Sequence, residues 1–155
     1  MTAEYMDRNK KKEEKKELLL AAIQKGENAE DFLWDALIEW QGTVFKTASG
    51  LPFTYTIHKG KRGQLTKELW IDRREGSKSL SFGSIRMAFQ NVCREKYSPR
   101  PKAMGDIRGV SYMYPIFWKL GIIEVPLKYA EKMKDKEYKS IAGVLYADNE
   151  TVKNR

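Results

Sequence analysis

The segment Lys102–Val125, KAMGDIRGVSYMYPIFWKLGIIEV, carries the clearest local pattern in the chain. Residues 102–108 are expected to form a short helix that Gly109 ends, because glycine adopts backbone angles that other residues resist. Ser111 is then a suitable N-cap for a second helix over residues 112–120, since its hydroxyl can accept a hydrogen bond from a free N–H of the first turn. The segment therefore predicts two short helices joined at a glycine.

Proline and glycine mark the ends of the second predicted helix. Pro115 falls near its first turn, where a missing N–H costs little; if the helix starts earlier, the same proline would kink it. Gly121 supplies a C-terminal stop, and Ile122, Ile123 and Val125 are expected to form the next strand. Helix, glycine turn, helix and strand in this order resemble the helix-turn-helix half of a winged-helix domain.

Two further helices are expected before the sheet. Residues 1–26 hold a mixed-charge run that becomes apolar near its end, which is typical of a charged N-terminal helix whose first residues fray. Asn28 is the expected N-cap of the second helix, with Asp31 in the capping-box position and Gly42 at the end. The acidic residues of this helix cluster on one face: Glu30, Asp31, Asp35 and Glu39. This face should stay away from a nucleic acid, or meet a basic partner surface.

Alternating residues predict a small antiparallel sheet. Residues 43–47 are expected to begin it, residues 53–57 alternate with the period of a half-buried strand, and residues 68–72 give a third strand. The result is a three-stranded meander, or a long hairpin preceded by an edge strand. The connection at residues 58–63 is basic and contains two glycines.

The second half of the chain is expected to be helical around the winged-helix-like segment. Ser79 or Ser81 should cap a third helix that runs to about Lys96. Residues 126–140 fit a helix or part of a wing loop, and residues 141–146 fit a closing strand.

These elements together predict an α+β fold with N-terminal helices, a small antiparallel sheet and a winged-helix-like C-terminal half. The expected organisation is a charged helix over residues 1–26, a single α+β domain over residues 27–146 and a polar tail over residues 147–155. The helix-turn-helix-like unit lies at residues 102–125. A chain of 155 residues has a normal size for one domain with an appendage.

The net charge of +8 is unevenly distributed along the chain. Residues 1–45 hold 7 Lys/Arg and 10 Asp/Glu, residues 46–102 hold 13 and 4, and residues 103–155 hold 9 and 7. A local basic surface of this size is typical of proteins that bind a polyanion. It also fits a soluble surface whose lysines are only solvated.

Phosphate contacts are expected from the two ends of the third predicted strand. Further contacts are expected from the connector before residue 102 and from the end of the predicted helix at residues 112–120. The predicted nucleic-acid-binding residues are Lys59, Lys61, Arg62, Arg73, Arg74, Lys78, Arg100, Lys102 and Lys119. If the two ends of the strand lie on one side, the first six of these form a phosphate-binding rim. The alternative is a loop that its charges keep soluble.

The second helix of the pair offers few groups for reading bases. It carries one cation and no Arg, Asn or Gln for bidentate contacts, which argues against a sequence-specific repressor of the usual kind. Its aromatic residues Tyr112, Tyr114 and Trp118 are candidate protein-binding anchors. They also fit stacking on bases, or simple burial in the core.

Signatures of catalysis and metal binding are few. His58 and Cys93 are the only histidine and cysteine, so neither a Cys–His zinc cluster nor an intramolecular disulfide can form. A P-loop and a dinucleotide-binding glycine motif are absent from the sequence. Asp72 and Glu75 give only a weak pattern for a magnesium-dependent nuclease. We therefore expect no enzymatic activity, no cofactor and no metal site.

The sequence also gives expectations about location and assembly. No apolar run approaches the roughly 20 residues that a membrane span needs. The N-terminus shows no apolar stretch of the kind found in secretory signals. A cytoplasmic protein without a membrane partner, monomeric or homodimeric, is expected.

Three stretches resemble a group of known proteins: FKTASGLPFTYTI (45–57), SLSFGSIRMAF (79–89) and VSYMYPIFWKLGII (110–123). They resemble small, poorly characterised proteins carried by phages and mobile elements of Gram-positive gut bacteria. The resemblance covers about half the chain and carries no functional residue across. It implies a context in which DNA-binding accessory factors and inhibitors of host defence nucleases occur, anti-CRISPR proteins among them.

Two functional hypotheses follow. The first is a non-catalytic protein of a phage or mobile element that binds DNA or RNA phosphates through its basic middle segment. The alternative is an anti-CRISPR-type inhibitor that binds a host defence nuclease or its nucleic-acid channel. Such an inhibitor would use the acidic helix at residues 30–39 or exposed aromatic side chains.

Overall fold

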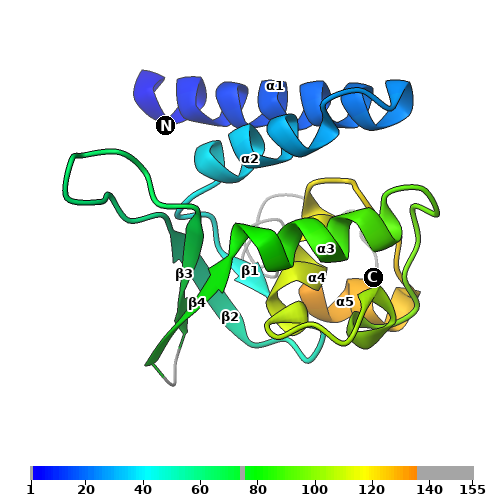
Figure 1. The fold of residues 1–155 in the computed structure, drawn as a ribbon. Helices are drawn as coiled ribbons and strands as arrows, with labels where there is room; N and C mark the ends of the chain where they lie inside the picture. Colours follow the sequence, from blue (N-terminus) through cyan, green and yellow to red (C-terminus); the bar gives the residue numbers. More distant parts are fainter. Residues whose placement is uncertain (1, 74–75, 136–155) are drawn as a thin grey trace.

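A computed structural model describes residues 2–73 and 76–135, which form an α+β fold. The elements in chain order are α1 (Ala3–Lys25), α2 (Ala29–Glu39), β1 (Phe45–Lys46), β2 (Pro52–Thr56), β3 (Glu68–Arg73), β4 (Gly76–Ser81), α3 (Phe82–Val92), the 3-10 helix η1 (Pro101–Met104), α4 (Val110–Lys119) and α5 (Leu127–Met133). Figure 1 shows α1 and α2 stacked together at the top, and α3, α4 and α5 beside the sheet.

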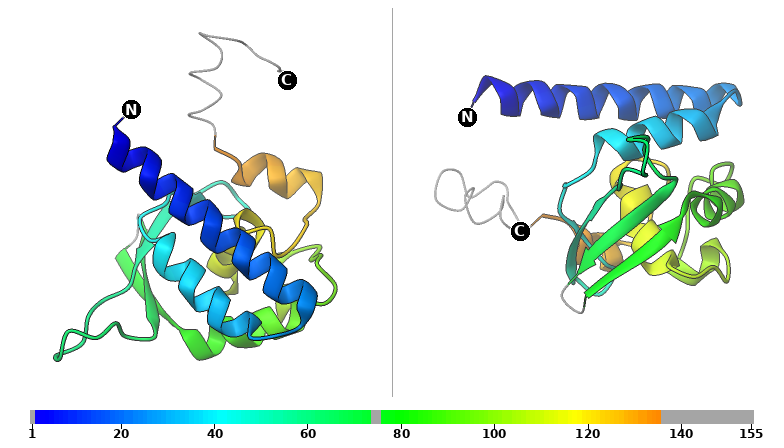
Figure 2. Two further views of the ribbon diagram at one scale, coloured as in Figure 1. Left: turned by 90° about the horizontal axis from the view of Figure 1, so that it is seen from above. Right: turned by 60° about the vertical axis from the view of Figure 1, so that its left-hand side comes forward.

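The four strands form one antiparallel sheet in the order β1-β2-β3-β4. Alternate side chains of a strand point to opposite faces, and those on the helix side are buried: Phe53, Tyr55, Leu69, Ile71 and Leu80. In the right-hand view of Figure 2 the strands lie in front of α4 and α5, so none of the helices in the described part of the chain covers the other face of the sheet, which we call the open face. Within the described residues β4 is an edge strand, because β3 is the one strand that pairs with it there.

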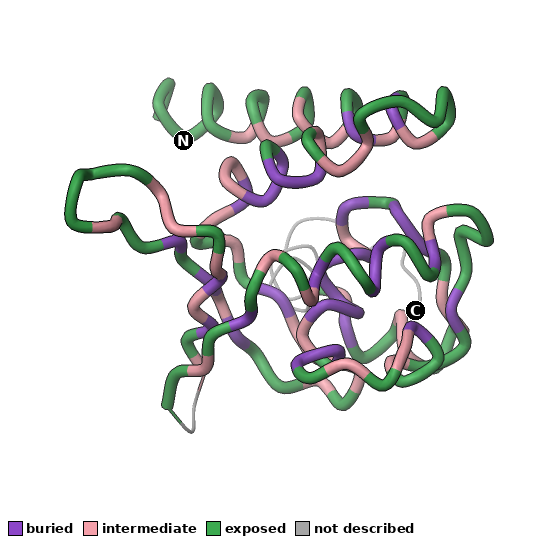
Figure 3. The backbone as a smooth tube through the Cα atoms, viewed as in Figure 1, coloured by how far each residue is buried: buried purple, intermediate pink, exposed green. Residues whose placement is uncertain are grey.

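The helix α4 forms the centre of the core. Six of its 10 residues are buried, namely Val110, Met113, Tyr114, Pro115, Ile116 and Phe117. Figure 3 shows the contrast with α1, whose backbone is exposed along most of its length. In α1 only Leu19 and Ala22 are buried. The fold is therefore organised around α4, and α1 is an outer layer packed on α2.

Buried polar groups of the large aromatic residues find backbone acceptors. The Tyr55 hydroxyl donates to the Leu37 carbonyl at 2.6 Å, and the Tyr114 hydroxyl donates to the Ser98 carbonyl at 2.7 Å. Burial raises the pKa of both tyrosines, so both remain neutral donors over the physiological range. Such bonds compensate the loss of hydration that burial imposes on a hydroxyl.

Several sequence predictions are confirmed. The α+β class, the N-terminal helices and the antiparallel sheet are all present. Gly26 ends α1 in the left-handed region, and Ser81 caps α3 by accepting a hydrogen bond from the Ser84 N–H at 3.1 Å. The predicted apolar stripe of this helix is buried: Ile85, Ala88, Phe89 and Val92.

The expected extent of the sheet and of two helices is wrong. A fourth strand, β4, includes Ser79, so Ser81 alone is the cap of α3. Serine and glycine are poor strand formers, which explains why this strand was not expected. α3 ends at Val92 instead of Lys96, and α2 ends at Glu39 instead of Gly42.

Asn28 is the N-cap of α2 as expected, but the predicted capping box is wrong. Asn28 has a positive φ of 54° and its side chain makes no capping hydrogen bond. Asn28 therefore serves as a turn residue, a role in which asparagine tolerates positive φ.

The winged-helix pattern is followed only in part at residues 102–125. Its first helix is reduced to the single turn η1, which Gly105 ends with φ 133°. The second helix starts at Val110, and its N-cap is Gly109 in the left-handed region instead of Ser111. Because the helix starts earlier than expected, Pro115 lies in its interior.

The strand predicted after α4 is wrong. Ile122 and Ile123 are both buried, whereas a strand with one open face would bury only one of two neighbours. The Ile122 N–H bonds the Phe117 carbonyl, and Glu124 makes only an isolated bridge with Tyr97. The next element is the helix α5, and the closing strand and polar tail predicted beyond it lie outside the described residues.

Gly109 is the position where a side chain is least tolerated. A Cβ built there would lie 2.1 Å from Leu80 Cδ2, and the residue has φ 88°. We expect Gly109→Ala to destabilise the fold by more than about 2 kcal/mol in urea unfolding, because strain and overlap add. Gly26→Ala is the matched control, since Gly26 has φ 74° and open space around it.

Leu80→Ala distinguishes overlap from backbone strain in this experiment. Removal of the Leu80 methyl groups should relieve the overlap, so Gly109→Ala should cost less in the Leu80→Ala background than in the wild type. Equal costs of Gly109→Ala and Gly26→Ala would contradict a close contact between α4 and β4.

Candidate nucleic-acid interface

Three cations meet where the end of the sheet contacts the start of α4. They are Arg73 at the end of β3, Lys78 on β4 and Arg108 just before α4. All three line one open groove of about 470 Å³ along the edge of β4, which we call the cation groove. The residues that line it are Glu68, Arg73, Ser77, Lys78, Ser79, Leu80, Ser81, Ser84 and Arg108.

Strand register and the approach of α4 explain this convergence. In the β3–β4 pair, Ile71 lies opposite Lys78 and Arg73 lies opposite Gly76, so Arg73 and Lys78 share the helix-facing side of the sheet. Arg108 lies beside them because the next residue, Gly109, packs directly on Leu80 of β4. Residues that are far apart in the sequence therefore form one charged cluster.

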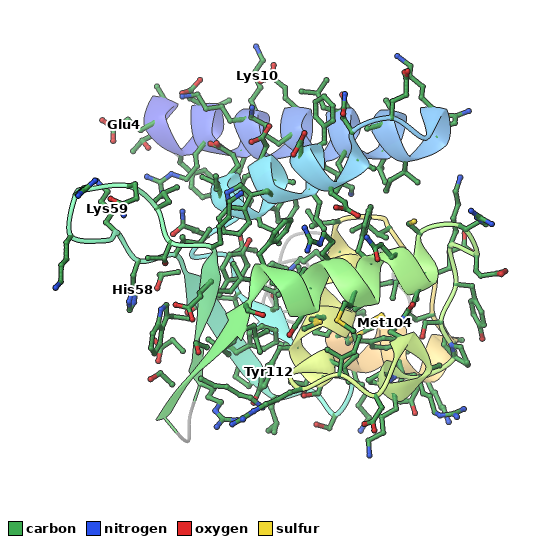
Figure 4. The ribbon with its side chains drawn as sticks, in the orientation of Figure 1. Glu4, Lys10, His58, Lys59, Met104 and Tyr112 are labelled. Atoms are coloured by element: carbon green, nitrogen blue, oxygen red, sulfur yellow. The ribbon has the colours of Figure 1, made fainter. Side chains whose placement is uncertain are left out.

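Tyr112 connects α4 to the cation groove. The Arg73 Nη1 donates to the Tyr112 hydroxyl at 2.6 Å, and Lys78 Nζ lies 5.8 Å from the centre of the same ring. The ring also makes an edge contact with Phe53 at 5.0 Å between centroids. Figure 4 shows Tyr112 at the lower end of the sheet, beside α4.

The positive charge of the groove is poorly compensated within the protein. Across the described ranges, no salt bridge reaches Arg73, Lys78 or Arg108. Burial and the neighbouring charges of Arg108 and Arg73 lower the pKa of Lys78. Glu68 is the one carboxylate among the lining residues that the structure describes. Three cations against one carboxylate leave an excess positive potential, which favours an anion.

The open edge of β4 adds neutral hydrogen-bond donors. The Phe82 N–H donates to the Lys67 carbonyl at 2.8 Å, which continues the β3–β4 register by one pair. Because antiparallel strands alternate bonded and non-bonded pairs, the N–H groups of Ser77 and Ser79 point to the open side. Hydroxyl and backbone N–H groups beside Lys and Arg are the usual donors to phosphate oxygens.

The predicted phosphate-binding rim is divided between two ends of the sheet. Lys59, Lys61 and Arg62 are exposed in the connection between β2 and β3, whereas Arg73 and Lys78 lie at the other end. The 6 residues of β3 separate them, which corresponds to roughly 20 Å. Figure 4 shows Lys59 and Tyr112 on opposite sides of the strands. The two ends do not lie on one side, so the condition for one phosphate-binding rim is not met.

The remaining predicted cations lie elsewhere. Arg100 and Lys102 are exposed at η1 and do not line the groove, and Arg74 lies outside the described residues. Lys119 is half-buried, and its Nζ donates to the Val44 carbonyl at 3.1 Å. Burial lowers the pKa of Lys119, with Asp135 opposing and Lys46 adding to this shift. Lys119 is therefore engaged within the fold.

The predicted protein-binding anchors are mostly internal. Tyr114 is fully buried, so its prediction as an exposed anchor is wrong. Tyr112 and Trp118 are half-buried and pack against the core. On the acidic helix α2, Glu30 accepts a hydrogen bond from Gln90 at 2.6 Å and lies 3.8 Å from Arg86. Part of the acidic face therefore stabilises the contact between α2 and α3.

The sequence reasoning missed Arg108 and the groove serines. The pattern predicts Arg108 within the first helix of the pair, but η1 ends at Met104, before it. Ser79 and Ser81 are predicted only as alternative caps of the third helix. The spacing of Ser77, Ser79 and Ser81 is the period of a strand, which is the signal that could have placed them on one side. Nothing local indicates that Arg108 lies beside them.

The comparisons with protein-family models, with curated proteins and with solved structures found no match for this chain. No helix in the described part of the chain is long and apolar enough to cross a membrane. Among the same residues, no group of three or more His, Cys, Asp and Glu side chains is placed to hold a metal ion. The cations and serine hydroxyls that line the groove are groups that can bind an anion by charge and hydrogen bonds.

The crowding of cations should be visible in the stability of the protein. We expect Lys78→Met to stabilise the protein slightly at neutral pH and low salt. The free energy of unfolding should rise by less than about 1 kcal/mol, because the substitution removes repulsion from Arg73 and Arg108. The pKa of Lys78 is lower in the folded state. The charged form of Lys78 therefore destabilises the folded protein below that pKa, and this destabilisation is relieved as pH rises through it. Thermal unfolding at several pH values measures this.

Lys10→Met is the matched control, because Lys10 is exposed on α1 and points away from the body of the protein (Figure 4). Salt near 1 M should reduce the difference between Lys78→Met and the wild type, since the Debye length falls to about 3 Å and the repulsion from Arg108 and Arg73 is screened, whereas the burial of Lys78 is unchanged. The stability of Lys78→Met relative to the wild type is compared at low and at high salt. A lower relative stability at low salt than at high salt would contradict repulsion in the groove.

Proposed function

We propose that this protein binds nucleic acid without transforming it chemically, and that backbone phosphates occupy the cation groove. The observation that carries the proposal is the convergence of Arg73, Lys78 and Arg108 on one open groove without a paired carboxylate among the described residues. A repeating anion is the ligand that such a surface binds best, because each neutralised phosphate releases a counterion.

The chemistry of the groove suits a phosphodiester chain. Arg108 and Lys78 supply charge, and the edge of β4 supplies the N–H groups and hydroxyls of Ser77 and Ser79. The groove follows an extended strand, so several successive phosphates can lie along it. The basic connection around Lys59 lies at the far end of the sheet, where it offers contacts to a longer nucleic acid.

The groove has little capacity to read sequence by itself. Its donors are Lys, Arg, Ser and backbone N–H groups, which bond phosphate oxygens equally well next to any base. The structure therefore supports binding with weak sequence preference and strong salt dependence. The phage or mobile-element setting stays a prediction from the sequence resemblance.

Removal of two groove charges should weaken binding in a way that salt reveals. We expect Lys78→Met combined with Arg108→Gln to lower affinity for a random duplex and to reduce the slope of log K against log salt by about 1.8, since each phosphate contact contributes about 0.9. Arg73 is left in place because its bond to Tyr112 supports the fold. Fluorescence anisotropy across a salt series measures both quantities.

Lys10→Met combined with Arg94→Gln is the matched control, because both side chains are exposed and neither lines the groove. This control should keep the wild-type slope. The proposal fails if the wild-type protein binds neither duplex nor single strands at low salt, or if both double variants lose the same slope.

A further inference from the structure

We infer that the open face of the sheet holds an unpaired base, stacked on the rings of His58 and Trp70, so that the bound nucleic acid is single-stranded there. This inference rests on the proposed function and deepens it. It assigns to the sheet a site for bases next to the groove that takes phosphates.

The two rings form a flat stack on the side of the sheet away from the helices. Their centroids are 4.8 Å apart and their planes differ by 5°. Trp70 lies between the buried residues Leu69 and Ile71, so its side chain is on the opposite, open face. Figure 4 shows His58 on this outer side, away from α3 and α4.

The stack is only partly covered by the protein. His58 is exposed and Trp70 is half-exposed, and none of the helices within residues 2–73 and 76–135 lies over this face in the right-hand view of Figure 2. An aromatic pair that remains open to solvent can be extended by another flat ring. Nucleobases stack on aromatic side chains with little dependence on sequence, because every base has a π-face.

The stack lies next to the cation groove. In the strand register Trp70 is opposite Ser79 of β4, and Ser79 lines the groove. Neighbouring strands are about 4.8 Å apart, and serine is too small to separate the indole from the groove. On its other side Trp70 is opposite Thr56 of β2, which is also short.

The charges around the stack favour one orientation of the ligand. Glu68 and Asp72 alternate with the buried residues of β3, so they share the open face with Trp70 and disfavour phosphates there. The cations lie at the margins, in the groove and around Lys59. A single strand meets both requirements, because its phosphates can follow the groove while its bases turn over the face.

A duplex cannot use this site in the same way. Its base faces are already stacked inside the helix, and only phosphates and base edges are presented to a protein. Single-stranded DNA and RNA both offer free base faces, so either can supply the ligand. The preference for a single strand should therefore depend on the aromatic stack, whereas duplex binding should depend on the groove alone.

Substitution of the aromatic residues tests the site. We expect Trp70→Leu and His58→Ala each to lower affinity for labelled oligothymidylate and oligouridylate by about tenfold, while affinity for a duplex of the same length stays unchanged. Trp70→Phe should retain most of the single-strand affinity, because it keeps a π-face. Tyr97→Ala is the control, since Tyr97 is an exposed aromatic residue that does not line the groove.

The outcomes separate this inference from the proposed function. His58 lies outside the strands, so we expect the His58→Ala protein to fold, which its unfolding curve verifies. The test therefore remains valid even if Trp70→Leu is poorly folded. Unchanged single-strand affinity in His58→Ala and in a folded Trp70→Leu protein overturns the stacking site and leaves the groove proposal standing. Absence of binding to every nucleic acid by the wild type overturns both.

Discussion

The close contact between Gly109 and Leu80 determines how the helices meet the sheet. A Cβ on Gly109 would lie 2.1 Å from a methyl group of Leu80, and the residue has φ 88°, so any other residue would be strained there and would displace the Leu80 side chain. The buried side of α4 then fills the core, and the Tyr112 ring reaches Phe53 and Arg73. The same approach brings Arg108 to Lys78, so one steric constraint produces both the core and the charged groove.

The fold was predictable where hydrophobic periodicity is strong. The spacing of Ile85, Phe89 and Val92 predicted α3, and the alternation of Phe53 and Tyr55 predicted the paired strands. β4 was missed because its residues are serine, glycine and lysine around a single buried Leu80. Residues 122–125 were misread because buried branched residues occur in core loops as well as in strands.

The candidate site was only partly predictable. Arg73 and Lys78 were identified from local basic composition, but the sequence cannot show which distant residue completes their cluster. Arg108 reaches them through the tertiary contact of α4. Lys59 was grouped with Arg73 although the 6 residues of β3 separate them, because the direction of a strand is not visible in a count of charges. Tyr114 was misassigned because an aromatic residue on a helix is equally compatible with the core.

The sheet thus divides the molecule into three surfaces with different chemistry: a helix-covered face that supplies stability, an edge with cations and serines, and an open face with an aromatic stack. The most direct test of the central claim follows the arginine Nε–Hε signals by NMR while oligothymidylate is added to isotope-labelled protein. If backbone phosphates occupy the cation groove, the signals of Arg73 and Arg108 should shift first and most. Larger shifts at Arg86 and Arg94, with Arg73 and Arg108 unchanged, would contradict it.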